Sequence, residues 1–268
     1  MVVRKTQFTC GSSGYLNDVS ASGPLVLLTD FGLEDPWVGV MRGVIASVDP
    51  ALSVIDLTHA IPPQDVARGA DVLAQGWRWF PVGSVFVAVV DPGVGTARAP
   101  LVARIEGRLF VGPDNGLCSR VAPDATDARL LPGSWGLAER SATFHGRDLF
   151  APAAARLAAG RVRFEDAEPV DFTRLADAPP GTVRSVDHFG NAITNLPGAQ
   201  GGVVRWRNLE VRVVSTYEEG EPEELIALTG SLGFLELAVR GGSARARFGI
   251  GIGDEVQWRP PEAGPRGP

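Results

Sequence analysis

Apolar side chains occupy every position from residue 85 to residue 90, and the run ends at Asp91. An alternating pattern would indicate a strand with one solvent-facing side, so this continuous pattern predicts a strand covered on both faces. Helices cover such strands in mostly parallel sheets, and ligands bind beyond the carboxyl ends of the central strands. Asp91 lies at that edge. A turn alone, or a turn combined with a ligand site, explains it, because Asp-Pro followed by glycines favours turns.

Strand-like and helix-like patterns alternate from residue 24 onward, which is typical of βαβ units. Within residues 34–50, apolar residues recur at steps of three and four, as on one face of a helix. We therefore expect an α/β, sandwich-like domain over residues 24–170 with a mostly parallel central sheet. Its strands are expected at residues 24–32, 52–59, 85–90, 100–107 and 108–116, and its helices at 34–50, 63–80 and 147–160.

The apolar periodicity lapses in residues 171–181, which contain a Pro-Pro pair and predict a linker. Beyond it, short runs of alternating apolar and polar residues predict strands throughout residues 182–260. We expect a smaller all-β, barrel-like domain there. Residues 1–23 and the Pro/Gly-rich tail from residue 260 predict loose extensions, and the first of them lacks the apolar stretch of a secretory signal.

Charge and cysteine content narrow the possible partners. The chain has 25 Lys and Arg against 31 Asp and Glu, a net charge of −6, and it lacks the basic runs that bind nucleic acid. Cys10 and Cys118 stand apart without the Cys/His spacing of a zinc site, which fits a reducing compartment. No stretch approaches the ~18 consecutive apolar residues of a membrane span. We expect a cytoplasmic protein that binds neither nucleic acid nor a membrane.

Polar side chains end three of the expected strands: Asp30, Asp91, and the neighbours Asp114 and Asn115. If these strands are parallel neighbours, the side chains meet at one edge of the sheet. Asp35, near the start of the first expected helix, suits either the helix dipole or the binding of a ribose diol or an ammonium group.

Arg98 and His145 are candidates for the same edge. Arg98 follows Asp91 across a turn-rich loop that can fold back, and His145 precedes the Ala-rich helix. Taken alone, the arginine suits a surface position and the histidine a structural one. An acid, an imidazole and a cation held together would instead suit acid–base chemistry.

Six motifs in order along the chain are LLTDFGLEDPWVG, IDLTHAIPPQDVARGA, VVDPGVGTAR, VGPDNGL, TFHGRDLFAPAAA and VDHFGNAITN. Through them, residues 24–258 resemble the S-adenosyl-L-methionine hydroxide adenosyltransferase family, which is related to the bacterial fluorinase and chlorinase. The resemblance implies an α/β domain joined to a β-barrel domain. It also implies a homotrimer whose substrate lies between neighbouring subunits.

The resemblance assigns roles to individual residues. The positions of Asp91, Arg98 and His145 match the family's proposed water-activating triad. Substrate-binding positions match Asp30 for the ribose hydroxyls, Asp35 and Asp187 for the methionine amino group, Asn191 and Tyr217 for adenine, and Ser231 for the carboxylate. The chain departs from the halogenating relatives at Leu232, because those relatives have arginine at this position.

The implied reaction converts S-adenosyl-L-methionine (SAM) and water to adenosine and L-methionine. The sulfonium makes methionine a neutral leaving group, so attack at the ribose C5′ needs neither a metal nor a cofactor. Arg98 supplies a positive field that stabilises hydroxide, and Asp91 or His145 accepts the proton. The halogenating enzymes resemble this chain but carry tyrosine at the position of Asp91, and the fluorinase carries serine at that of Gly146. A halide would meet a like charge at Asp91, so the sequence favours water.

Three alternatives stay open. The first alternative is a sensor that binds adenosine or SAM without significant turnover. The second is a 5′-halo-adenosine synthase that uses halide. The third alternative, a metal-dependent phosphohydrolase, needs more metal ligands than His59, the histidine nearest to the strand-end acids in the sequence.

Overall fold

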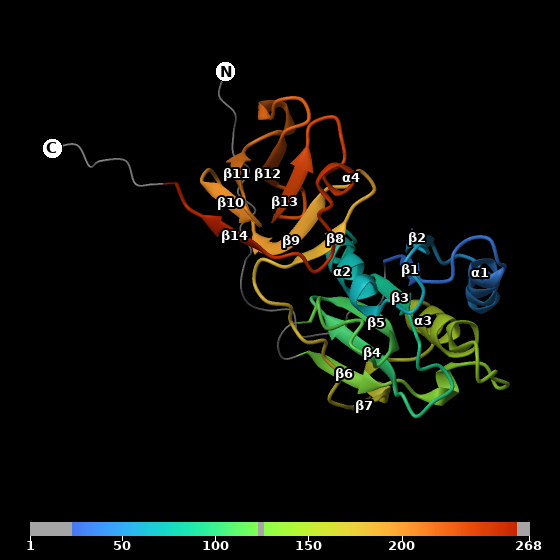
Figure 1. Ribbon diagram of the computed structural model, residues 1–268. Helices are drawn as coiled ribbons and strands as arrows, with labels where there is room; N and C mark the ends of the chain where they lie inside the picture. Colours follow the sequence, from blue (N-terminus) through green and yellow to red (C-terminus); the bar gives the residue numbers. More distant parts are fainter. Residues whose placement is uncertain (1–22, 123–125, 262–268) are drawn as a thin grey trace, which may run out of the picture.

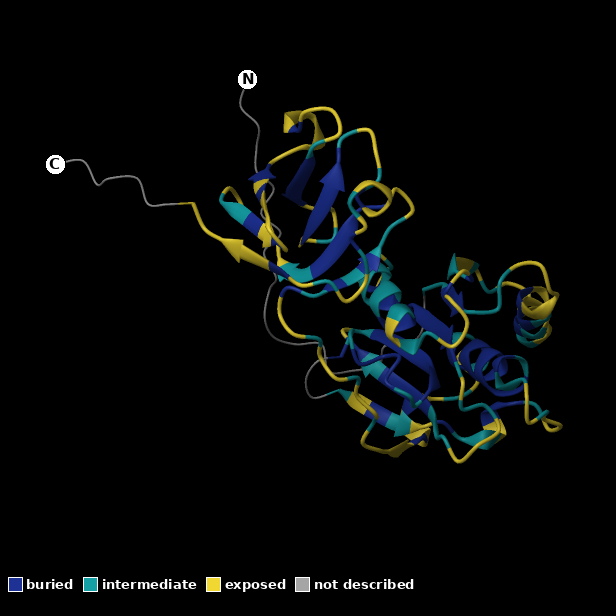
Figure 2. Ribbon diagram, in the orientation of Figure 1, coloured by how far each residue is buried: buried dark blue, intermediate teal, exposed yellow. Residues whose placement is uncertain are grey.

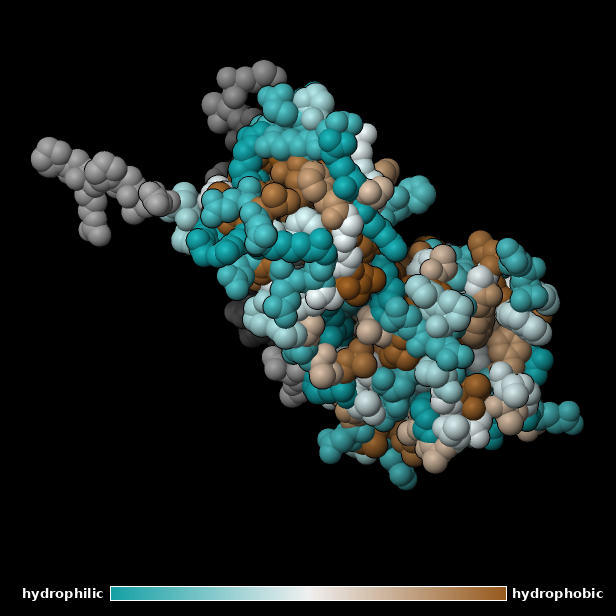
Figure 3. All heavy atoms as spheres, viewed as in Figure 1, coloured by the Kyte–Doolittle hydropathy of each residue, from teal (hydrophilic) through white to brown (hydrophobic). Residues whose placement is uncertain are grey.

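The computed structural model describes residues 23–122 and 126–261, which form two lobes joined at a narrower waist (Figures 1 and 3). The amino-terminal lobe contains the first of two sheets. The strand order in the first sheet is β2-β1-β3-β5-β4-β6-β7. These strands are β1 (Leu25–Thr29), β2 (Val54–Thr58), β3 (Val85–Val89), β4 (Pro100–Ile105), β5 (Arg108–Pro113), β6 (Asp127–Leu130) and β7 (Glu168–Pro169).

Strand direction in this sheet is mixed. β2, β1, β3 and β5 are parallel neighbours, whereas β4 runs antiparallel to β5 and β6, and β6 runs antiparallel to β7. The prediction of a mostly parallel sheet is therefore wrong for the outer strands. The reason is the two-residue connection between β4 and β5, where Glu106 and Gly107 have φ values of 50° and 73° and form a hairpin turn. A parallel pair would need a much longer crossover.

Helices cover both faces of β1 and β3, as the continuous apolar pattern predicted. Successive residues of β1, such as Leu25 and Val26, face two different apolar clusters. α1 (Trp37–Val48) and α3 (Ala151–Ala158) contribute to one cluster, and α2 (Val66–Trp77) contributes to the other. All residues of β1 and β3 are buried (Figure 2), and burial of each large aliphatic side chain contributes roughly 1.5–3 kcal/mol.

The carboxyl-terminal lobe holds the second sheet. Its strand order is β14-β10-β11-β12-β13-β9-β8, with β11 and β12 parallel and the other neighbours antiparallel. The sheet curls until its two ends meet at a bridge between Thr182 and Glu255. The strands are β8 (Val183–Val186), β9 (Ala192–Pro197), β10 (Val203–Trp206), β11 (Leu209–Val214), β12 (Leu225–Thr229), β13 (Phe234–Val239) and β14 (Val256–Arg259).

Short helices complete the two lobes. The second lobe also contains the helix α4 (Ala244–Phe248), which an all-β prediction missed because it spans just over one turn. The remaining elements are η1 (Gly133–Trp135), η2 (Gly146–Phe150), η3 (Phe164–Asp166) and η4 (Tyr217–Glu219).

The lobes contact each other through charged side chains. Arg184 of β8 forms an ion pair with Asp71 of α2, and Arg120 forms one with Asp177 in the connecting segment. The backbone N–H of Thr173 in that segment donates to Asp114 Oδ1 at 2.6 Å. These contacts anchor the connection between β7 and β8 to the first lobe.

The two cysteines and the chain ends differ in whether they fall within the described residues. Cys118 is buried as a free thiol, and burial raises its pKa to about 12, whereas Cys10 lies outside the described residues. Of the extensions expected at residues 1–23 and from residue 260, residues 1–22 and 262–268 also lie outside them. In the described ranges, no helix is both long enough and apolar enough to cross a bilayer.

Candidate functional site

Three strand ends meet at one edge of the first sheet. β1, β3 and β5 are adjacent and parallel, so the residues that follow them, Asp30, Asp91 and Asp114, share that edge. Asn115 Nδ2 donates to the carbonyl of Val90 at 2.8 Å, which ties the end of β5 to the end of β3. Asp114 instead bonds to the connecting segment, so it serves a structural contact here.

Arg98 joins the two other candidate groups at this edge. Its Nε donates to Asp91 Oδ1 at 3.1 Å, and one terminal nitrogen pairs with Asp91 Oδ2. The same nitrogen lies 3.1 Å from Nδ1 of His145. The Arg98 and Asp91 side chains are only 8% and 5% exposed, so the pair is largely shielded from water. The structure thus brings together the three residues that the sequence could not place beside one another.

Two loops bring these residues together. The loop after β3 turns back through hydrogen bonds from Val94 N to Asp91 O and from Thr96 N to Gly93 O, both 3.2 Å. Gly95 has a φ of 76°, and a Cβ there would lie 2.4 Å from the carbonyl oxygen of Ala142. Glycine therefore permits the close approach of the loop that precedes His145.

His145 immediately precedes an irregular helical turn. Residues Gly146–Phe150 form the π-helical turn η2, which continues into α3. Such turns are frequent at functional sites. Asp148, buried in this turn, accepts a hydrogen bond from Ser141 N at 2.8 Å and so holds the loop that carries His145.

The Arg98 contact determines the tautomer of His145. A guanidinium has donors and no acceptor, so Nδ1 must accept the hydrogen bond and the neutral ring carries its proton on Nε2. Burial and the Arg98 charge both lower the pKa of His145 from its ordinary value of 6.5. The imidazole is therefore neutral at pH 7, with its N–H group free to donate elsewhere.

Aromatic side chains beside His145 were not predicted as site residues. The Phe144 ring makes edge contacts with Phe31 at 5.8 Å and with Trp37 at 5.4 Å between ring centroids. A Cβ at Gly146 would lie 3.3 Å from both phenylalanine rings and from Met41 Sδ. In the sequence, the only signal for the two phenylalanines was their position next to predicted site residues, since Phe31 follows Asp30 and Phe144 precedes His145. The cluster provides an apolar wall, and its side chains would have to shift slightly to admit a Cβ at position 146.

Asp30 and Asp35 differ in how far they are fixed. Asp30 Oδ2 accepts a hydrogen bond from the backbone N–H of Gln64 at 2.8 Å. Gln64 has a φ of 66°, an unusual conformation for a residue with a side chain, so the backbone is strained where it orients this carboxylate. Asp35 is exposed, and α1 begins after it with Pro36 as its N-cap.

A second group of predicted residues lies in the carboxyl-terminal lobe. Asp187 accepts hydrogen bonds from the backbone N–H of Asn191 at 2.8 Å and from its Nδ2 at 3.0 Å. The hydroxyl of Tyr217 donates to Glu236, a buried acid that the sequence analysis did not single out. Ser231 is exposed in the turn between β12 and β13. An acid within the apolar run FLELAV was the available signal for Glu236.

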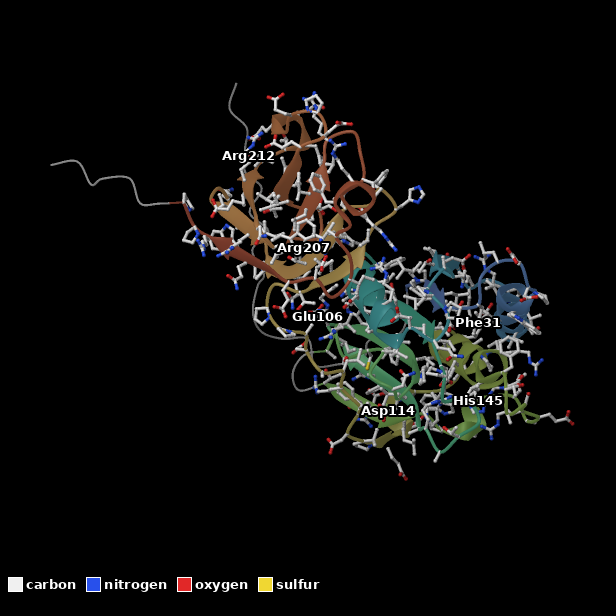
Figure 4. The ribbon with its side chains drawn as sticks, in the orientation of Figure 1. Phe31, Glu106, Asp114, His145, Arg207 and Arg212 are labelled. Atoms are coloured by element: carbon white, nitrogen blue, oxygen red, sulfur yellow. The ribbon has the colours of Figure 1, made fainter. Side chains whose placement is uncertain are left out.

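The two groups lie in different lobes of one chain. Figure 4 shows Phe31 and His145 on the part of the amino-terminal lobe away from Arg212 in the other lobe. Within the described residues, the contacts of Asp91, Arg98 and His145 all stay inside the first lobe. A single chain therefore does not bring the two groups into contact.

His59 does not extend the site into a metal centre. Its Nδ1 lies 2.8 Å from the hydroxyl of Thr29, and its Nε2 lies 3.1 Å from Asp56 Oδ1, so it links the ends of β1 and β2. Within residues 23–122 and 126–261, no group of three or more His, Cys, Asp or Glu side chains is placed to hold a metal ion.

Comparison with known proteins agrees with the resemblance seen in the motifs. The model of the SAM hydroxide adenosyltransferase N-terminal domain matches residues 25–168, and that of the C-terminal domain matches residues 181–257. A Thermus thermophilus protein named (R)-S-adenosyl-L-methionine hydrolase is 42% identical over 256 residues, or 87% of this chain and 98% of that protein. One of the same name from Salinispora tropica is 41% identical, covering 85% and 95%.

More distant relatives and a solved structure are also similar. A fluorinase from Actinoplanes is 27% identical over 216 residues, which cover 64% of this chain and 71% of the fluorinase. The crystal structure of an uncharacterized conserved protein from Thermotoga maritima superposes with a TM-score of 0.80 at 33% identity. The superposition covers 88% of this chain and all of that one.

The ionisation of His145 is testable by its dependence on Asp91. Burial and Arg98 lower the pKa of His145, whereas the negative charge of Asp91 raises it. Asp91→Asn removes that charge, so the pKa of His145 should fall further below 6.5. NMR titration of the imidazole measures this change. Because the folded-state pKa is depressed, the stability that neutral His145 contributes is present above pH 6.5 and is lost as the pH falls through the folded-state pKa. Asp114→Asn is the control, and an unchanged pKa in Asp91→Asn would contradict the contact.

Proposed function

The chain belongs to the SAM hydroxide adenosyltransferase family, and we propose that it hydrolyses SAM to adenosine and L-methionine by attack of water at the ribose C5′. The observation that carries the proposal is the contact of Arg98 with both Asp91 and His145 at the edge of the sheet. The names of the relatives support it, and they further suggest the (R) epimer at sulfur as the substrate.

The substrate itself removes one difficulty of this reaction. Methionine leaves the sulfonium as a neutral thioether, so no acid is needed to protonate the leaving group. The reaction as proposed uses no cofactor. Water is the weak participant, because the pKa of bulk water is about 15.7, and a nearby cation favours its hydroxide form. Arg98 and the sulfonium both supply positive charge for this purpose.

Asp91 is the better candidate for the group that accepts the proton from water. Each of its oxygens accepts one hydrogen bond from Arg98 and retains a second lone pair. His145 Nδ1 is already occupied by Arg98, and its Nε2 carries a proton in the neutral tautomer. We therefore assign Asp91 as the base and the Nε2–H of His145 as a donor that orients the attacking water.

The remaining predicted residues would bind the rest of the substrate. Asp30 is assigned to the ribose hydroxyls, and its fixed orientation by Gln64 supports that role. The binding groups for methionine and adenine are assigned to Asp35, Asp187, Asn191, Tyr217 and Ser231. Leu232 follows Ser231 in the turn, so backbone N–H groups or another cation must replace an arginine in binding the carboxylate.

We propose further that the site forms between copies of the chain, as a homotrimer. The division between residues 24–170 and 182–260, with a linker at 171–181, separates the two groups of site residues. Each lobe also exposes aromatic side chains near its group, with Trp37 43% exposed in the first lobe and Phe189 73% exposed in the second. A neighbouring lobe that covered them would complete the site and exclude water.

Isotopic labelling tests the reaction. In oxygen-18 water, the label should appear in the 5′-hydroxyl of adenosine, because water attacks carbon rather than sulfur. Mass spectrometry of both products measures it, with (R)-SAM expected to be consumed faster than (S)-SAM. Label in methionine would contradict attack at C5′. Binding of adenosine without its formation would indicate a sensor, and a 5′-halo product in the presence of halide would indicate a halogenating enzyme.

The role of Asp91 is tested by a variant of nearly identical shape. Asp91→Asn should bind adenosine as the wild type does but lose turnover by about 10²–10⁴-fold, the usual contribution of a general base. Calorimetry and product assays measure the two effects separately. Asp114→Asn, at the neighbouring strand end, should retain turnover. Full activity in Asp91→Asn would exclude Asp91 as the base.

Mixing two inactive variants tests the shared site. Asp91→Asn and Asp187→Asn each damage one lobe, so each alone should be inactive. In trimers assembled from equal amounts of both chains, about a quarter of the sites would combine two intact lobes from neighbouring chains. Activity should recover to about that fraction of the wild type. If the site lies within one chain, every site keeps one defect and activity will not recover.

A further inference from the structure

Glu236 is a buried acid near the candidate site residues of the second lobe. It lies in the middle of β13 and is 6% exposed. Its neighbours Leu235 and Leu237 face the main core of the curled sheet, whereas Ala238 belongs to a small apolar cluster on the other face. Because side chains alternate along a strand, Glu236 shares this second face with Ala238. A carboxylate among apolar groups loses most of its hydration.

The Glu236 carboxylate contacts two predicted parts of the binding site. One oxygen accepts a hydrogen bond from the hydroxyl of Tyr217, the first residue of the turn η4. The other oxygen packs against Gly230, where a Cβ would lie 2.1 Å from it. Gly230 precedes Ser231 in the turn between β12 and β13. Glu236 therefore bridges the aromatic residue and the turn assigned to opposite ends of the substrate.

The charges around Glu236 do not favour its burial. Burial raises its pKa above the ordinary value, the hydrogen bond from Tyr217 lowers it in part, and the nearby negative charge of Asp187 raises it. No cation within the described residues contributes to that pKa. A buried carboxylate without a cationic partner normally lowers the stability of a fold. A buried acid that lacks a cationic partner and contacts two binding elements points to a role in ligand binding.

We propose that Glu236 is a positioning residue of the nucleoside site, which fixes the Tyr217 ring and the Gly230–Ser231 turn before the ligand binds. The inference rests on the proposed function, because it takes the Tyr217 ring as one wall of the adenine pocket. Tyr217 is 43% exposed, so without the hydrogen bond its ring would sample several rotamers. Ordering the ring during binding would then reduce affinity.

Four variants test this role. Glu236→Met keeps the volume but removes the acceptor, and it should weaken adenosine binding roughly tenfold, as expected for loss of a charge-assisted hydrogen bond. Glu236→Gln should bind adenosine as the wild type does, because its amide oxygen still accepts the hydrogen bond from Tyr217. Tyr217→Phe should match Glu236→Met, and the double variant should be no weaker, since both remove one interaction. Glu210→Ala, at an exposed glutamate of β11, is the control.

Three measurements separate positioning from a structural role. Calorimetry gives the adenosine Kd, product assays give KM and kcat for SAM, and thermal unfolding gives Tm. For Glu236→Met we expect a higher KM, a kcat within about threefold of the wild type because no group at the reacting atoms changes, and a Tm that is not lowered. Ultraviolet titration should show a lower Tyr217 pKa in this variant, because Glu236 raises it.

Failure of this inference is distinguishable from failure of the proposed function. Unchanged adenosine binding in Glu236→Met would overturn the inference, as would additive effects of Glu236→Met and Tyr217→Phe. A lowered Tm with intact binding would show that Glu236 stabilises the fold instead. A wild type that binds adenosine but never forms it from SAM would contradict the proposed function, while the comparison of variants would still decide the role of Glu236.

Discussion

The candidate site depends on one guanidinium that contacts a carboxylate and an imidazole at the end of a buried strand. Arg98 pairs with both oxygens of Asp91 and donates to Nδ1 of His145, and it is almost fully shielded from water. Removing either charge of such a pair would leave the other buried and uncompensated, at a cost of about 3–5 kcal/mol. The same contact keeps His145 neutral in one tautomer. Structure and proposed chemistry therefore constrain the same three side chains.

The surrounding fold explains how a charged pair persists at this position. Helices cover both faces of β1 and β3, so the strand ends form a rigid edge rather than a mobile loop. Backbone hydrogen bonds turn the loop after β3 back toward Asp91, and Gly95 lets this loop approach the backbone at Ala142. His145 immediately precedes the π-helical turn, and its imidazole contacts Arg98 of that loop. Backbone geometry and the Arg98 contacts thus act together at the site.

The candidate residues of the second lobe also lie in turns at strand ends. Asp187 follows β8, Tyr217 and Ser231 lie beyond the ends of the parallel strands β11 and β12, and Tyr217 bonds to the buried Glu236. The first lobe provides the Arg98–Asp91 pair, the carboxylate of Asp30 and an aromatic wall, whereas the second provides Asp187, the buried Glu236 and an exposed tyrosine. A cationic nucleoside such as SAM suits a site that combines both. The separation of the lobes within one chain is the physical basis for proposing a shared site between chains.

Local sequence patterns determined the strands and helices near the site, because apolar periodicity depends on neighbouring residues alone. They also located Asp30, Asp91 and Asp114 at strand ends, and motif order indicated the family. Tertiary structure decided what depends on residues distant in sequence. Arg98 and His145 are 47 residues apart, and their contact requires two loops to meet at Gly95. The antiparallel β4 and the bond from Tyr217 to Glu236 likewise arise from strand pairing and sheet curvature, which no local periodicity specifies.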